Sequence, residues 1–233
     1  MALAEDGAAN GTLVVADKQT AGRGRRGHSW KTMGGTTIAM SLICRPEVQP
    51  GHASMLTLVM GLALADAIQD VCGEETQIKW PNDTVIHGKK VTGTLTEMSA
   101  EMECVHYVVI GTGINVNTEA EDFEDEIKDV AGSLKTECGH TCNRAEVIAK
   151  CMDYFEKYYE TFQKTEDLSG LKEAYEAKLV NKDAHVRVLD SKGEYEGIAR
   201  GIDEMGDLLV ETDGELHKVY AGEVSVRGLY GYT

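Results

Sequence analysis

The stretch GRGRRGHSW, residues 22–30, narrows the choice of fold more than any other part of the sequence. It lies between two apolar segments, residues 13–16 and 36–44, whose β-branched composition predicts buried strands. The five glycines between residues 18 and 35 leave little to bury, so we expect a long loop between these strands. Long loops inside compact domains are commonly functional.

This loop is an island of positive charge in an acidic protein. The chain of 233 residues has a net charge of −16, yet residues 18–45 contain no Asp or Glu. Arginines spaced by glycine can bring guanidinium groups and backbone N–H groups onto one anion, and Trp30 could cover a planar ligand. The segment therefore predicts an anion site. Two alternatives stay open from the residues alone: a solvated loop, and an RNA-binding segment, although such segments are usually longer and repetitive.

The composition limits the class of protein. With 42% hydrophobic and 27% charged residues, the chain can form one sizeable core, with room for a small second domain. The acidic net charge disfavours nucleic acid as a partner. We find no apolar run of membrane-spanning length and no secretory signal in residues 1–10. The six cysteines are scattered, which favours free thiols and a cytoplasmic protein.

The rest of the chain divides into two parts. Residues 52–71 predict a helix that is apolar nearly all round and therefore buried. Asn143 followed by Glu146 predicts the start of a second helix, with apolar residues at helical spacing from 147 to 162. The remaining elements of the first part are short strands at 78–80, 84–86, 90–97 and 105–116, with a hairpin turn at 87–88, and a helix at 171–179. After residue 183, five short strands predict a small barrel: 185–189, 194–202, 208–211, 216–220 and 224–226.

Further motifs carry weaker signals. Residues 79–83 (KWPND) form a turn at a strand end, and Lys89-Lys90 follows the hairpin turn. Residues 111–117 (GTGINVN) allow a ligand to approach the backbone or mark a bulge. Residues 138–142 (CGHTC) suggest zinc, but a structural zinc site needs four ligands and no second pair of ligands is evident. We therefore expect a chance cluster and no metal site.

Taken in order, residues 19–27, Trp30, and residues 79–83, 89–97 and 111–117 resemble the biotin protein ligase family, and residues 222–227 (GEVSVR) resemble its small terminal domain. The resemblance implies an α/β (α+β) fold. A catalytic domain similar to class II aminoacyl-tRNA synthetases, with a mixed sheet, would span residues 1–181. An SH3-like barrel would span residues 182–233.

The resemblance also implies an activity. Members join biotin to ATP, forming biotinyl-5′-AMP and pyrophosphate, and then transfer biotin to one lysine of a biotin carboxyl carrier domain, as in acetyl-CoA carboxylase. Mg²⁺ is expected with ATP, and a homodimer is one expected assembly. No nucleic-acid or membrane partner is expected. We expect the non-repressor type, without the helix-turn-helix that is found at the front of some members.

The family motif assigns roles to ten residues. Because two anions must meet, catalysis requires charge neutralisation and alignment. The expected catalytic residues are Arg23, Arg25 and Lys90. The expected biotin contacts are Gln19, Arg23, Gly24, Arg25, Lys90 and Gly93, and the expected nucleotide contacts are Trp30, Asn82, Asn115 and Arg227. No metal ligand is expected among the side chains.

Two departures from the family pattern have consequences. The sequence opens near the end of a helix that in relatives follows a Ser-Thr-Asn segment, so we expect an N-terminally truncated chain with one wall of the biotin pocket missing. His28 stands where the family usually has arginine. A neutral histidine offers fewer donors, so we expect weaker contacts with ATP or pyrophosphate that improve in mildly acidic solution.

Three other functions compete with biotin ligation. A lipoate–protein ligase shares the fold and the chemistry, although the arginine loop together with KWPND favours biotin. A truncated, inactive fragment would bind an adenylate or a carrier protein without turnover. An RNA-binding module built on the arginine loop is disfavoured by the acidic net charge.

Overall fold

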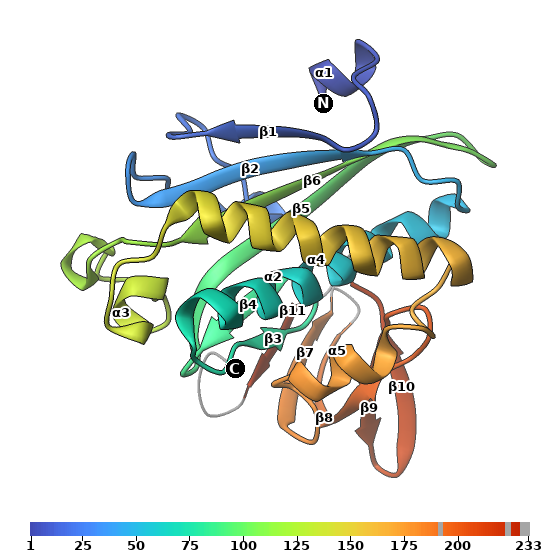
Figure 1. Cartoon of the computed structure of the whole chain (residues 1–233). Helices are drawn as coiled ribbons and strands as arrows, with labels where there is room; N and C mark the ends of the chain where they lie inside the picture. The colour runs from blue at the N-terminus through green and yellow to red at the C-terminus, as the bar shows by residue number, and fades with distance from the viewer. Residues whose placement is uncertain (191–192, 222–224, 229–233) are drawn as a thin grey trace.

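The fold is built on a six-stranded sheet that is followed in the chain by a five-stranded sheet (Figure 1). The computed structural model describes residues 1–190, 193–221 and 225–228. The start of the predicted strand at 224–226 and the first three residues of the GEVSVR motif, 222–224, lie outside these residues. The strands of the first sheet are β1 (Thr12–Ala16), β2 (Thr37–Cys44), β3 (Gln77–Lys79), β4 (Asp83–Ile86), β5 (Lys89–Ala100) and β6 (Val105–Asn115).

The first sheet has the order β1-β2-β6-β5-β4-β3, and its five strand pairs are all antiparallel. The expectation of a mixed sheet is therefore wrong for the described strands; parallel pairing is limited to isolated bridges such as Ile78 with Leu179. The bulge considered for residues 111–117 does not occur at Gly111 or Gly113, because β6 runs through both glycines while paired on both sides. Short hairpin connections account for the antiparallel pairing of β3, β4, β5 and β6.

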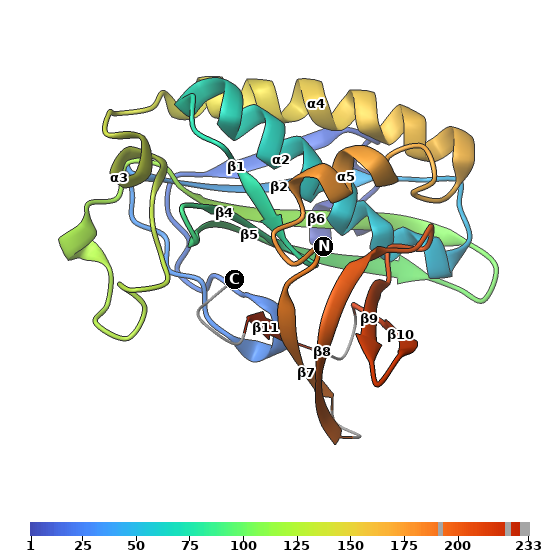
Figure 2. The ribbon, with the colours of Figure 1, turned by 90° about the horizontal axis from the view of Figure 1, so that it is seen from below.

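Helices α2 (Leu56–Cys72), α3 (Leu134–Cys138), α4 (Arg144–Thr165) and α5 (Lys172–Lys178) lie on the side of the sheet that faces the main core. The short α1 (Ala2–Glu5) packs on the opposite face, where Ala4 forms a separate cluster with Ile43, Tyr107 and Val109. As predicted, α2 is buried nearly all round, because it lies between the sheet and α4 (Figure 2). The predicted start of α4 is confirmed, since the Asn143 side chain accepts hydrogen bonds from the N–H groups of Ala145 and Glu146.

Among the described residues, the stretch Pro50–Cys72 passes the length and composition test for a membrane span, with a mean hydropathy of 1.6. The expectation that no apolar run approaches that length is therefore wrong by composition. In the fold, 72% of this window is buried against protein, which is typical of a core helix.

The two faces of the sheet differ in chemistry. On β6, Val108, Ile110 and Ile114 join the main core below α2. The alternate residues of a strand point to the opposite face, where Gly111 and Gly113 pair with Ser41 and Ala39 of β2. This second face therefore has a shallow central floor of small residues. The basic loop lies on the same face, close to β11 (Figure 2).

The second sheet contains β7 (His185–Asp190), β8 (Gly193–Ile202), β9 (Leu208–Thr212), β10 (Glu215–Val219) and β11 (Ser225–Gly228) in the order β10-β9-β8-β7-β11. These strands match the five that the sequence predicts. Their buried residues belong to the same hydrophobic cluster as α2. Trp80 of the first part donates its indole N–H to the Gly206 carbonyl at 2.9 Å, so the two parts pack as one body.

Candidate active site

The basic loop forms a small closed hairpin. The backbone N–H of Trp30 donates to the Gly22 carbonyl at 3.0 Å, and that of Gly24 donates to the His28 carbonyl at 2.7 Å. Arg25–Gly27 form a short 3-10 turn, with Arg26 at φ 54°. A Cβ at Gly22 would lie 2.2 Å from the Trp30 carbonyl oxygen, so this crossing needs glycine. The hairpin thus fixes where the tryptophan leaves the loop.

Trp30 lies on a floor made by two glycines. Gly93 of β5 and Gly113 of β6 are directly paired across the strands. A Cβ at Gly113 would be 2.3 Å from Trp30 Cε2, and a Cβ at Gly93 would be 3.3 Å from both Trp30 Cζ3 and Lys90 Nζ. The indole therefore occupies space that only glycine leaves open. Its Nε1 is buried, and within the described residues it has no hydrogen-bond partner.

Lys90 stands at the edge of this floor. Its Nζ lies 2.6 Å from Asp83 Oδ1 and 5.8 Å from the centre of the Trp30 ring. The backbone around it is held as well, because Lys90 N–H donates to the Val130 carbonyl and Gly132 N–H donates to the Lys90 carbonyl. The lysine is thereby fixed in position and balanced by one carboxylate, which suits a group that must meet a ligand anion.

A second cation, Lys79, lies in the same cluster. Burial lowers the pKa of Lys79 to about 8; Asp83 opposes this shift, and Lys90 and Arg227 add to it. A low-dielectric surrounding disfavours the charged ammonium, and two neighbouring cations disfavour it further. The influence of Arg227 indicates that this exposed residue of β11 brings positive charge toward the cluster from the second sheet.

Arg25 connects the loop to both parts of the chain. Its Nη1 donates to Asn82 Oδ1 at 2.9 Å, and its Nη2 donates to the Ala221 carbonyl. Burial lowers the pKa of Arg25, while the nearby Asp83 raises it. Asn82 is itself fixed, because its side chain donates to the Thr94 carbonyl at 3.2 Å and its carbonyl accepts from Thr94 N–H. Arg25 and Asn82 are therefore ordered before any ligand binds.

Other predicted site residues lie outside this cluster. Arg23 pairs with Glu97 at 3.1 Å, and its side chain is 68% exposed. Gln19 is exposed and accepts a hydrogen bond from Thr32. The buried Asn115 donates to the Gly132 carbonyl at 3.1 Å. The structure thus brings together Arg25, Trp30, Asn82, Lys90 and Gly93, whereas Arg23 and Gln19 lie around them at the surface.

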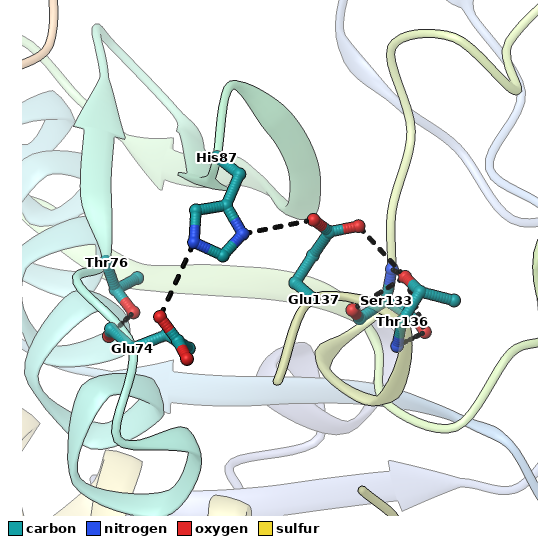
Figure 3. A network of polar contacts seen from close by, with 6 residues as sticks. All are labelled: Glu74, Thr76, His87, Ser133, Thr136 and Glu137. Carbon is teal, nitrogen blue, oxygen red and sulfur yellow. Dashed lines mark hydrogen bonds and ion pairs between the residues drawn. The ribbon is translucent and has the colours of Figure 1, made fainter. Parts of the chain in front are cut away.

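The turn that leads into β5 is held by a polar network (Figure 3). His87, at the tip of the β4–β5 hairpin, lies 3.4 Å from Glu74 through Nε2 and 3.4 Å from Glu137 through Nδ1. Glu74 follows α2 and Glu137 belongs to α3, so the network ties the hairpin to two helices. This support lies three residues before Lys90.

Sequence reasoning missed some members of the cluster. Asp83 and Lys79 are part of the KWPND motif, but spacing did not indicate that both lie beside Lys90. Gly113 was expected only to let a ligand approach the backbone. Its pairing with Gly93 below Trp30 depends on the register between β5 and β6. The segment 130–132 gave no signal in the sequence, because its role is to pair with the Lys90 backbone.

A cavity of about 400 Å³ lies elsewhere, between α2 and α5, and its lining includes Asp66, Gln69 and Lys178. It shares no lining residue with the cluster around Lys90. The candidate site is therefore described by the floor of Gly93 and Gly113 and by the cations beside it, Lys90 and Arg25.

Comparison with known proteins gives matches along most of the chain. The model of the biotin/lipoate A/B protein ligase family matches residues 3–115, and the model of the biotin protein ligase C-terminal domain matches residues 184–227. The bifunctional ligase/repressor BirA of Bacillus subtilis is 42% identical over 224 residues, which cover 96% of this chain and 69% of that protein.

Two further relatives match nearly end to end. The biotin–[acetyl-CoA-carboxylase] ligase of Paracoccus denitrificans is 30% identical, with 95% of this chain and 93% of that protein covered. The biotin protein ligase of Aquifex aeolicus, solved in complex with biotin and ATP, superposes with a TM-score of 0.84 at 31% identity, covering 97% of this chain and 93% of that one.

Proposed function

Because the chain belongs to the biotin protein ligase family, we propose that it is an ATP-dependent ligase that attaches biotin to one lysine of a biotin carboxyl carrier domain. In the first step a carboxylate oxygen of biotin attacks the α-phosphate of ATP, and pyrophosphate leaves. In the second step the lysine amine attacks the acyl carbon of biotinyl-5′-AMP, and AMP leaves.

The observation that carries this proposal is the position of Lys90 and Arg25 beside the floor of Gly93 and Gly113. The first step brings two anions together, so it requires fixed cations at the reacting atoms. Lys90 is held by Asp83 at 2.6 Å, and Arg25 is held by Asn82 at 2.9 Å. Both side chains are ordered without ligand, which lowers the reorganisation needed for reaction.

We assign roles on this basis. Arg23, Arg25 and Lys90 act on the reacting carboxylate and phosphate. Gln19, Gly24 and Gly93 join them in binding biotin, and Trp30, Asn82, Asn115 and Arg227 bind the nucleotide. No side chain is assigned as a resident metal ligand in this reaction. Mg²⁺ would enter with ATP, held mainly by phosphate oxygens and water.

A flat ligand on the floor requires Trp30 to move. The indole fills the space above Gly113, and its buried Nε1 has no partner within the described residues. A ligand that lies on the paired glycines would displace the indole, which could then cover the ligand and use the unsatisfied N–H. Arg23, which is 68% exposed, would turn inward from Glu97 with the same loop movement.

We divide the chain into a catalytic domain at residues 1–181 and an SH3-like domain at residues 182–233. The contact between Arg25 and Ala221 supports a role for the second domain in closing the site. The carrier domain is the macromolecular partner. A homodimer, a cytoplasmic location and the lack of nucleic-acid and membrane partners stay predictions from the sequence.

Lipoate ligation is the alternative, because one matching family model includes biotin and lipoate ligases. The match of residues 184–227 to the biotin protein ligase C-terminal domain favours biotin.

Exchange of labelled pyrophosphate into ATP, measured with biotin, lipoate or no acid, decides between the two acids. We expect exchange with biotin only, followed by labelling of a carrier domain and its loss when the acceptor lysine is changed to arginine. Exchange with lipoate alone, or no exchange with either acid by the folded chain, contradicts the proposal.

A further inference from the structure

Three cysteines meet at one point of the fold, and one of them, Cys72, is far in sequence from the other two, Cys138 and Cys142. Cys72 ends α2, Cys138 ends α3, and Cys142 lies in the turn before α4. Their sulfur atoms all lie within 4.8 Å of one another. Cys72 and Cys142 are buried, and Cys138 is partly buried. The CGHTC spacing offers two of these thiols, and the fold adds the third, which the sequence analysis did not anticipate.

The separation of the sulfur atoms suits a shared ion better than a covalent bond. Cys138 Sγ and Cys142 Sγ are 3.7 Å apart. Two thiolates bound tetrahedrally to zinc at about 2.3 Å are about 3.8 Å apart. A disulfide would need about 2.05 Å between the same atoms. All six cysteines of the chain are free thiols in this structure.

His140 is the nearest candidate for a fourth donor. Its exposed side chain places Nδ1 4.0 Å from Cys142 Sγ and 3.4 Å from the Thr141 carbonyl, so the ring would turn toward the thiols on binding an ion. Its carbonyl accepts a hydrogen bond from Cys138 Sγ at 3.4 Å. Gly139, at φ 77°, makes the turn that reverses the chain between the two cysteines. Three thiols and one imidazole match the Cys₃His set of structural zinc sites, and the four-residue step from Cys138 to Cys142 lies within their usual ligand spacing.

The ligand segment is held in place by other side chains. The Asn117 amide donates to the Cys142 carbonyl and accepts from its N–H, both at 2.9 Å. His87 contacts Glu74 and Glu137 (Figure 3), which lie two residues after Cys72 and one residue before Cys138. A metal site gains affinity when its ligands are fixed in this way by neighbours.

Burial disfavours the thiolate form of two of the cysteines, Cys72 and Cys142. It raises the pKa of Cys142 to about 11, with a further contribution from Cys138, and it also raises the pKa of Cys72. A bound dication would displace the thiol protons to solvent.

We propose that Cys72, Cys138, Cys142 and His140 bind one zinc ion, which fastens the end of α2 to the turn between α3 and α4. The ion would stabilise the segment that leads from β6 to α4. Residues 130–132 of this segment pair with the backbone of Lys90. The site is structural, because four protein ligands leave no open position for a substrate.

The test uses the full chain, purified under reducing conditions from medium with added zinc. We expect about one zinc ion per chain by elemental analysis. Replacement by Co²⁺ should give a thiolate-to-cobalt charge-transfer band and the intense visible bands of tetrahedral cobalt. A chelator should lower the melting temperature, and added zinc should restore it.

Variants assign the ligands. Cys138→Ser and Cys142→Ser should reduce bound zinc to background, and His140→Ala should weaken Co²⁺ binding by at least about tenfold. Cys104→Ser is the matched control, since Cys104 is exposed and outside the cluster, and it should bind zinc like the parent chain. If a serine variant does not fold, the cobalt spectrum of the parent chain still decides.

Three results would overturn the proposal. The first is a reduced, folded chain that binds no zinc and gives only the spectrum of octahedral cobalt. The second is equal zinc binding by the Cys138→Ser and Cys104→Ser variants. The third is a Cys138–Cys142 disulfide that forms readily in the presence of excess zinc. Unchanged cobalt affinity in His140→Ala would contradict the assignment of the fourth ligand.

Discussion

Lys90 and Asp83 form an ion pair across the β4–β5 hairpin, with 2.6 Å between Lys90 Nζ and Asp83 Oδ1. Asp83 is aligned in the sheet with Gly93, whose missing side chain leaves room for the lysine and for Trp30. One carboxylate thus positions the lysine and balances its charge at the edge of the floor.

Removing either partner of this pair should slow biotin adenylation. Lys90→Ala removes the cation and should lower the rate of pyrophosphate exchange by about 100-fold or more. Asp83→Asn keeps the shape of the side chain but removes the charge that holds Lys90. We therefore expect the rate of pyrophosphate exchange to fall by about tenfold, mainly through kcat. Lys89→Ala is the matched control and should exchange at the parent rate. A parent-like Asp83→Asn enzyme would remove Asp83 from the positioning of Lys90.

Adding a methyl group to the floor should displace Trp30. Gly113→Ala puts a Cβ 2.3 Å from the indole, whereas Gly93→Ala puts one 3.3 Å from it. We therefore expect Gly113→Ala to change the Trp30 fluorescence and to cost about 1–3 kcal/mol in the free energy of unfolding, with a smaller effect for Gly93→Ala.

The emission of Trp30 can be isolated by subtraction, because the chain has two tryptophans and Trp80 is buried. Trp30→Phe gives the baseline from Trp80 alone. The placement of the indole on the glycine floor would be wrong if Gly113→Ala left both the emission and the unfolding free energy unchanged.

Lys79 should make stability depend on pH in the alkaline range. Its pKa is about 8 in the folded protein and 10.5 ordinarily. Between these values the unfolded chain binds more protons, so the free energy of unfolding should rise with pH from about 8 to 10.5. At pH 7 the buried charge costs at most about 3 kcal/mol.

Lys79→Met should therefore be more stable than the parent at pH 7, and the difference should shrink by pH 10. Urea unfolding across this range measures the effect, with Lys164→Met on the exposed face of α4 as the control. If the free energy of unfolding of Lys79→Met differed from that of the parent by the same amount at pH 7 and at pH 10, the lowered pKa assigned to Lys79 would be wrong.

His28→Arg should strengthen binding of ATP. His28 is exposed and lies between the 3-10 turn and Trp30, and an arginine would add fixed charge and planar donors. We expect the KM for ATP to fall by about two- to tenfold, with the KM for biotin unchanged. His28→Gln is the neutral control, and its KM for ATP should not fall below that of the parent. An unchanged KM for ATP in His28→Arg would refute this role.

The sequence predicted well those elements that have local causes. The start of α4 depends on the Asn143 side chain and on helical spacing, and both are visible in the sequence. The short helix α3 was missed, although Ser133 and Thr136 form a capping box at its start, because five helical residues give too little periodicity. The antiparallel sheet was also missed, because the relative direction of two strands depends on which strands pair in the folded sheet.

The structure brings together several residues of the family motif, whereas their contacts with one another were not predictable from the sequence. The family motif identified Arg25, Asn82 and Lys90, which lie in one cluster. Long-range packing decides the rest: the Lys90–Asp83 pair, the influence of Arg227 on Lys79, and the contact of Arg25 with Ala221. The meeting of Cys72 with Cys138 and Cys142 has the same origin, because no sequence spacing joins residues 72 and 138.

The hydrogen bond from Trp80 to Gly206 limits how independently the two parts of this protein can evolve. Trp80 follows Lys79 and precedes Asn82 of the site, yet the hydrogen-bond partner of its indole lies in the turn between β8 and β9 of the second sheet. A chimaera that exchanges the small terminal unit for that of a distant relative would have to match this contact as well as the docking of Arg25. The two parts are therefore expected to be inherited together, as coadapted halves of one enzyme.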